Sequence, residues 1–88
     1  MPAKIVEPSR FTDSDIAARK MVEIANAVEA AQDGRIYIEP VNGRFLSEGG
    51  TPDQFRAGLA QAIAAAWLWR HESGTYVKFT AAGAEMFA

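Results

Sequence analysis

The chain has 88 residues, which is enough for one small domain and too few for two. Nine basic and eleven acidic residues give a formal net charge of −2, so the chain as a whole has no basic field that attracts phosphates. It contains no cysteine, which excludes disulfides and cysteine metal sites. No apolar run approaches the roughly 20 residues of a membrane-spanning helix, and the N-terminus lacks a signal-peptide core. We therefore expect a soluble, cytoplasmic protein.

The N-terminal third predicts an arm followed by a long helix. Two prolines and no periodicity mark residues 1–11, which we expect to form a flexible or pairing arm, with residues 12–88 as the single domain. Apolar residues then recur at helical spacing as far as the stop at Gly34. The pattern predicts a helix from about Asp13 to Gln32, with Thr12 as its N-cap.

The middle of the chain predicts a strand and two further helices. Residues 35–39 alternate polar and apolar side chains, which predicts a short strand that Pro40 terminates. Residues 42–48 predict one or two helical turns capped by Asn42. Thr51 and Gln54 form a capping-box pattern around a proline at the first helical position, so a third helix should begin there. Gly58 inside this helix indicates close packing. The inward stripe of the third helix should be Phe55, Leu59, Ala62, Ile63 and Ala66.

The C-terminal third predicts a β-hairpin and a last short helix. Two alternating runs, residues 67–71 and 75–79, flank a turn centred on Ser73 and Gly74. This register pairs Leu68 with Phe79 and Arg70 with Val77 on one face, and Trp69 with Lys78 and His71 with Tyr76 on the other. Thr80 should cap the last helix, with Met86 and Phe87 folding back onto the domain.

The order of these elements resembles the winged helix-turn-helix fold. The stretch from Tyr76 to Met86 is similar to the passage Y-x-x-[LF]-T-x-x-G-x-x-[LM], which leads from the wing strand into the last helix of MarR- and PadR-like regulators. The resemblance implies an α+β, winged-helix-like domain with three N-terminal helices, a short strand, a β-hairpin and a short C-terminal helix. It also implies DNA-associated transcriptional regulation as a homodimer, through the helix that follows Gly49 and Gly50.

The candidate DNA-binding residues follow from that resemblance and from their chemistry. The amide side chains of Gln54 and Gln61 can read adenine edges. The free amides of the helix that Thr51 opens can hold an anion. Four further side chains could contact phosphates if the fold brings them together, namely Arg44, Arg56, Arg70 and Lys78.

The alternative is a protein-interaction or dimerisation module with the same fold and no DNA binding. Small side chains at Ala57, Ala60 and Ala64 would let another backbone approach the third helix. The hairpin face with Trp69, His71 and Tyr76 could stack bases, but such a face is more often covered by an arm, a helix or a second subunit.

Catalysis is not expected. His71 is the single histidine, so one chain cannot form a two-histidine metal site. None of the serines lies in a nucleophile-elbow setting. The sequence therefore predicts a non-enzymatic binding domain without a cofactor or metal.

Overall fold

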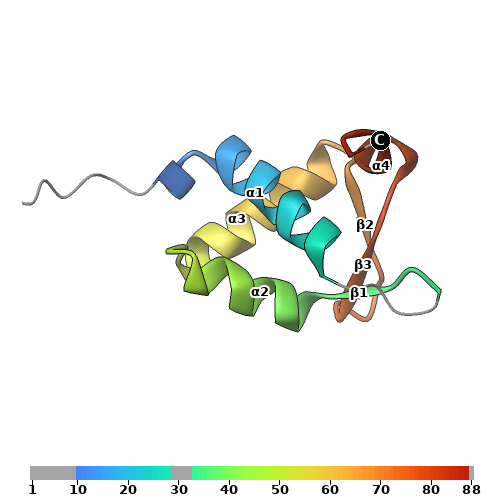
Figure 1. Ribbon diagram of the computed structural model, residues 1–88, viewed down its shortest axis with the longest axis horizontal. Helices are drawn as coiled ribbons and strands as arrows, with labels where there is room; N and C mark the ends of the chain where they lie inside the picture. The colour runs from blue at the N-terminus through green and yellow to red at the C-terminus, as the bar shows by residue number, and fades with distance from the viewer. Residues whose placement is uncertain (1–9, 29–32, 88) are drawn as a thin grey trace, which may run out of the picture.

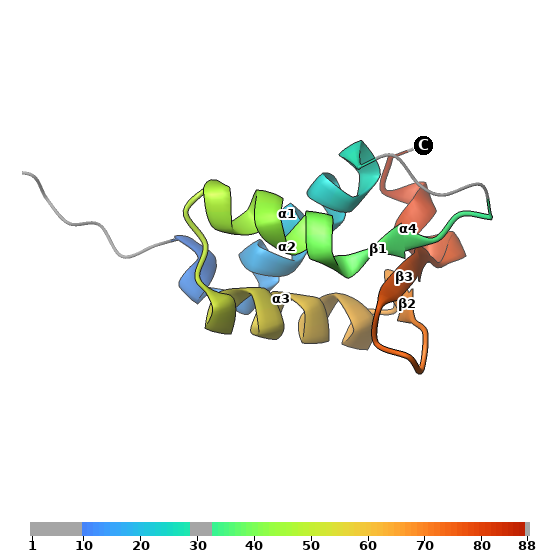
Figure 2. The ribbon, with the colours of Figure 1, turned by 90° about the horizontal axis from the view of Figure 1, so that it is seen from below.

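Helices form one end of the molecule, and a small sheet with a short C-terminal helix closes the other end (Figures 1 and 2). The computed structural model describes residues 10–28 and 33–87. Its three strands form an antiparallel sheet in the order β1-β3-β2. The predicted α+β class is confirmed. The elements are η1 (Arg10–Thr12), α1 (Ser14–Ala27), β1 (Ile36–Tyr37), α2 (Ile38–Ser47), α3 (Pro52–Ala64), β2 (Leu68–Arg70), β3 (Tyr76–Phe79) and α4 (Ala81–Glu85).

Both ends of α1 differ from the prediction. Asp13, not Thr12, is the N-cap, because its carboxylate accepts the backbone N–H of Asp15 at 2.9 Å. The helix ends at Ala27, since Val28 takes an extended conformation with ψ 132°. Val28 packs against the core from this extended conformation. The last residues of the predicted helix, 29–32, lie outside the described part, as do residues 1–9 of the predicted arm.

The predicted strand at residues 35–39 is mostly wrong. β1 has only two residues, and α2 begins at Ile38, before Pro40. Proline is tolerated in a first helical turn, where its missing N–H has no intrahelical partner to lose. The backbone N–H of Ile38 instead donates to the carbonyl of Thr75 at 3.0 Å, which ties the start of α2 to the sheet. The N-cap of α2 is Tyr37 without a side-chain bond, so the prediction of Asn42 as a cap was also wrong.

The start of α3 is confirmed in detail. The Thr51 hydroxyl accepts the backbone N–H of Gln54 at 3.1 Å, and the Gln54 side chain accepts the backbone N–H of Thr51 at 3.1 Å. A methyl group on Gly58 would lie 3.0 Å from the Cβ of Ala17, so the close packing expected there is the contact between α1 and α3. Ala66 does not belong to the inward stripe. It lies beyond the helix with φ 64° and is exposed.

The hairpin register is confirmed as predicted: Leu68 pairs with Phe79, Trp69 with Lys78 and Arg70 with Val77. Thr80 caps α4, since its hydroxyl accepts the backbone N–H of Gly83 at 3.0 Å.

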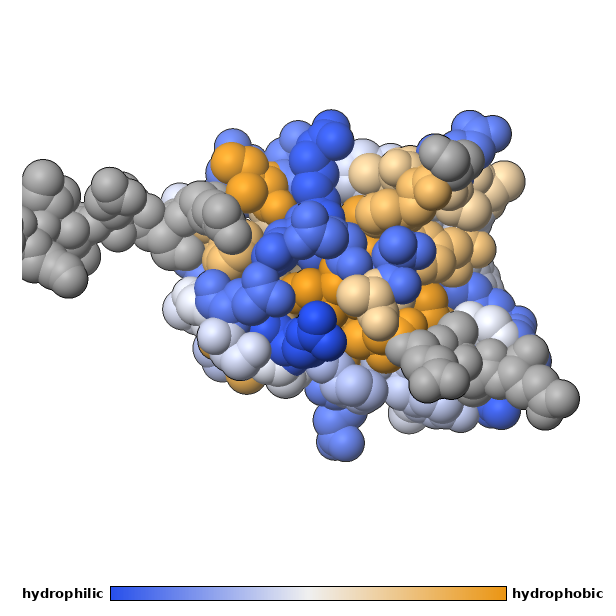
Figure 3. All heavy atoms as spheres, in the orientation of Figure 1, coloured by the Kyte–Doolittle hydropathy of each residue, from blue (hydrophilic) through white to orange (hydrophobic). Residues whose placement is uncertain are grey.

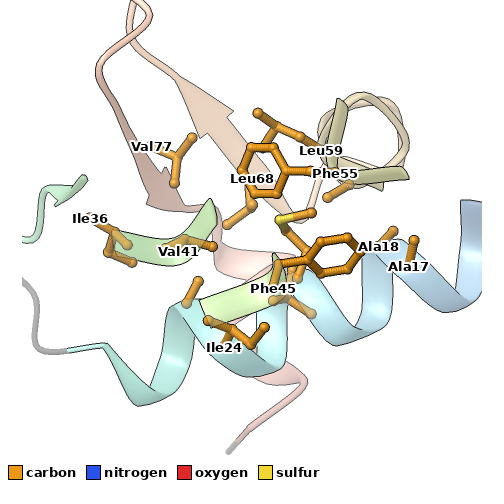
Figure 4. Packing of buried hydrophobic residues seen from close by; sticks show 14 of the residues in the cluster. Ala17, Ala18, Ile24, Ile36, Val41, Phe45, Phe55, Leu59, Leu68 and Val77 are labelled. Atoms are coloured by element: carbon orange, nitrogen blue, oxygen red, sulfur yellow. The ribbon is translucent and has the colours of Figure 1, made fainter. Parts of the chain in front are cut away.

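The core lies where the three long helices meet the inner face of the sheet (Figure 4). Phe45 of α2 is fully buried, with its ring centroid 4.8 Å from that of Phe11 and 5.8 Å from that of Phe55. Ile36, Leu68 and Val77 cover the sheet side of this core. The opposite face of the sheet does not take part in this core.

Candidate functional site

A groove of about 500 Å³ runs between the start of α2, one flank of α3 and strand β2. Its apolar lining comes from α3 and from the first residue of α2, whereas β2 contributes a charged side chain. Two guanidinium groups, Arg56 of α3 and Arg70 of β2, lie in the same groove. The apolar lining residues are Ile38, Phe55, Leu59, Ala60, Ile63 and Ala64.

The two arginines differ in how their charge is balanced. Arg56 forms an ion pair with Asp53 one turn earlier on the same exposed helix face. Arg70 has no ion pair with any carboxylate that the structure describes, and its guanidinium donates only a long bond of 3.4 Å to the carbonyl of Gly74. The groove thus contains apolar walls and one uncompensated positive charge.

The outward face of α3 is short of groups that read or hold DNA. Ala57, Ala60 and Ala64 are exposed along it, and Gln61 is half-buried. Thr51 and Gln54, at the start of the helix, form its capping box through the Thr51 hydroxyl and the side-chain carbonyl of Gln54. Amide and hydroxyl groups that cap a helix are less available for base contacts.

The four candidate phosphate-binding cations do not form one cluster. Arg56 and Arg70 share the groove. Arg44 is exposed on α2 and does not line this groove. Lys78 lines a separate hollow beside the end of α1. Arg70 pairs with Val77, so Lys78 is one position out of register with it across the hairpin, and the two side chains point to opposite faces of the sheet.

The outer face of the sheet carries a connected group of rings. Tyr76 stacks on His71 with centroids 4.6 Å apart and planes 15° apart, and both rings touch Trp69, at 6.4 Å and 5.9 Å. Trp69 is 49% exposed, and no described segment covers it. The sequence pattern missed Tyr37, which pairs with Tyr76 because β1 joins the sheet at its edge (6.0 Å between centroids).

Arg35 adds a cation to this aromatic face. Its guanidinium carbon lies 5.6 Å from the ring centroids of both Tyr37 and Tyr76. The same guanidinium donates to Asp33 at 2.8 Å, and this hydrogen bond, aided by the charge of Lys78, lowers the pKa of the Asp33 carboxyl below its ordinary value. The carboxylate of Asp33 therefore offsets the positive charge at this edge of the sheet.

His71 and Ser73 come within hydrogen-bond distance, with 2.8 Å between Nδ1 and Oγ. The backbone N–H of Ser73 donates to the same Nδ1 at 3.1 Å, and Oγ also contacts the hydroxyl of Thr75 at 2.9 Å. These contacts close the hairpin turn.

Comparison with known proteins finds no matching family model, no matching curated protein and no matching solved structure. Within residues 10–28 and 33–87, no helix is both long and apolar enough to cross a membrane. The same residues contain no group of three or more His, Asp or Glu side chains that could hold a metal ion.

Proposed function

We propose that the chain is a non-enzymatic, winged-helix-like binding domain of the cytoplasm that recognises another protein through the groove between α3 and β2. The observation that carries the proposal is the groove itself. Six apolar side chains line a hollow of about 500 Å³ beside an arginine that has no described carboxylate partner. Exposed apolar surface rimmed by polar groups is typical of protein-interaction sites.

Support for the winged-helix identity comes from topology and sequence together. The order α1, β1, α2, α3, β2, β3 with the strand order β1-β3-β2 is compatible with that fold. The stretch from Tyr76 to Met86 adds the sequence resemblance. One fold serves many functions, so the choice of partner rests on the surface and not on the topology.

The surface favours a protein over duplex DNA. Phosphate contacts normally supply most of the affinity for DNA, and they need lysine or arginine in one cluster. Here Arg56 is paired with Asp53, and Lys78 lies in a different hollow from Arg70. An apolar lining gives phosphates nothing to bind but suits the apolar face of a protein segment.

The test compares a variant that fills the groove with one that adds the same charge elsewhere. Ala60→Arg places a long side chain in the groove, and Ala27→Arg adds the same charge at the exposed end of α1, outside the groove. Circular dichroism should show both variants folded. Affinity capture with the immobilised domain should retain a protein partner on wild type and on Ala27→Arg, and lose it on Ala60→Arg. The proposal fails if Ala60→Arg retains the same proteins as wild type.

Duplex DNA is the second candidate function, because α3 follows the glycine turn in the order typical of a recognition helix. Fluorescence anisotropy of a random duplex, titrated at about 50 and about 200 mM salt, tests it. Binding that weakens steeply with salt, and that Arg44→Gln, Arg56→Gln or Arg70→Gln reduces, would support DNA and displace the protein-binding proposal. No binding at roughly 100 μM protein in the lower salt would exclude it.

A further inference from the structure

We infer that the groove between α3 and β2 takes the C-terminal segment Glu85–Phe87 of a second copy of this chain, so that two copies dock reciprocally. This inference rests on the proposed function, since it names the protein partner of the same groove. It is carried by a match between an unbalanced positive charge inside an apolar groove and an unbalanced negative charge beside exposed apolar side chains.

The groove side of the match is Arg70. Its neighbours in the groove are aliphatic or aromatic, and the other arginine, Arg56, already has Asp53. Covering the groove with a purely apolar segment would remove Arg70 from water without a carboxylate, which is costly. A fitting occupant therefore has apolar side chains for the walls and a carboxylate for Arg70.

The described part of the chain offers one segment of that kind. Glu39, Glu72 and Glu85 form no ion pair with a described cation and cap no helix. Of these three, only Glu85 is followed by two consecutive large apolar side chains that are exposed: Met86 at 37% and Phe87 at 38%. The other described carboxylates, Asp13, Asp15, Glu23, Asp33, Glu48 and Asp53, bind a helix N-terminus or a cation.

The Glu85–Phe87 segment packs against its own domain and still exposes apolar surface. The Phe79 and Phe87 rings contact edge to face with centroids 5.9 Å apart, so the segment lies against the sheet end while more than a third of Phe87 stays exposed. The sequence led us to expect both Met86 and Phe87 to fold back onto the domain, and this contact accounts for only part of their surface. Figure 3 shows apolar residues gathered over the end of the molecule that carries α4.

Reciprocal docking closes the assembly. Each copy carries one groove and one Glu85–Phe87 segment, and in a dimer with a twofold axis both pairs of contacts form at once. A closed dimer buries the exposed apolar segment and both grooves, which also adds burial that a domain of this size otherwise lacks.

Charge reversal tests the pairing. Sedimentation equilibrium of the full chain should give a dimer, and Arg70→Glu and Glu85→Arg should each raise its dissociation constant at least about tenfold, because an attractive pair becomes repulsive. An equimolar mixture of the two variants should restore dimerisation to within about threefold of wild type, since every pair in the mixed dimer is again attractive. Arg44→Glu and Glu72→Arg are the matched controls, with the same charge changes on exposed residues outside the groove and the segment. They should leave the constant unchanged.

The outcomes separate this inference from the proposed function. A wild-type chain that stays monomeric at about 1 mM overturns the reciprocal dimer. Capture of a different protein that Ala60→Arg abolishes would still support the groove as a protein site. A dimer whose constant is insensitive to Arg70→Glu and Glu85→Arg, or is not restored in the mixture, overturns the pairing. A dimer that forms with Ala60→Arg as tightly as with wild type would contradict use of the groove altogether.

Discussion

Gly83 and Gly43 are both helical glycines, but their surroundings differ completely. A methyl group on Gly83 would lie 2.8 Å from the carbonyl carbon of Trp67 and closer still to its oxygen, whereas one on Gly43 would meet nothing within 4 Å. Gly83 is buried where α4 crosses the chain leaving α3. The same residue type is therefore required at one position and replaceable at the other.

Substitution by alanine should have opposite signs at these two positions. Gly83→Ala should lower the free energy of unfolding by about 2 kcal/mol, because backbone atoms of Trp67 must move. Gly43→Ala should raise it by up to about 1 kcal/mol, because alanine has the higher helix propensity and the space is open. Urea unfolding followed by circular dichroism measures both. Equal effects of the two substitutions would contradict the close approach at Gly83.

Among the helices, α3 has the strongest local signals and α2 the weakest. The capping box at Thr51 uses four consecutive residues, so the pattern of one short segment predicts where α3 begins. The start of α2 has no such cap, and its first N–H bonds to Thr75, which is distant in sequence. A proline that local rules assign to the end of a strand thus lies in the first turn of a helix.

The capping box gives a prediction for α3. Thr51→Ala removes the oxygen that accepts the Gln54 N–H and should lower the free energy of unfolding by about 1 kcal/mol. Thr51→Ser keeps that oxygen and should stay within about 0.5 kcal/mol of wild type. Thermal unfolding of the three proteins at one pH gives the comparison. A loss as large in Thr51→Ser as in Thr51→Ala would show that the methyl group, not the cap, is responsible.

At the scale of the whole molecule, stability depends on one aromatic cluster. Phe45 is fully buried between Phe11 of η1 and Phe55 of α3, so three elements meet on its ring. Small domains have little stability to spare, because they bury a smaller fraction of their surface than larger ones.

Phe45→Ala should therefore cost about 3 to 5 kcal/mol and leave the domain largely unfolded at physiological temperature. Its neighbour Leu46 is 37% exposed, so Leu46→Ala serves as a control and should cost less than about 1 kcal/mol. Heteronuclear NMR spectra distinguish the cases, since an unfolded chain loses amide dispersion. A well-dispersed spectrum of Phe45→Ala would contradict this account of the core.

The candidate site could be predicted only in part. The alanine face of α3 and the aromatic face of the hairpin follow from periodicity and register, which are local properties of the chain. The groove combines Arg56 of α3 with Arg70 of β2, which are 14 positions apart in the chain. Tyr37 and Arg35 reach the aromatic face only because β1 pairs with β3. Each of these contacts joins residues that are far apart in the chain, so none of them can be predicted from a short window of sequence.

By itself the sequence determined the α+β class, the start of α3, the caps at Thr51 and Thr80, the hairpin register and the close packing at Gly58. Each depends on residues a few positions apart, or on a steric requirement of one residue type. Only the tertiary structure decided where α1 ends, that α2 begins before Pro40, and which charged side chains share a groove. These depend on contacts between distant segments, because burying one large apolar side chain contributes about 1.5 to 3 kcal/mol, more than the roughly 1 kcal/mol of a local preference.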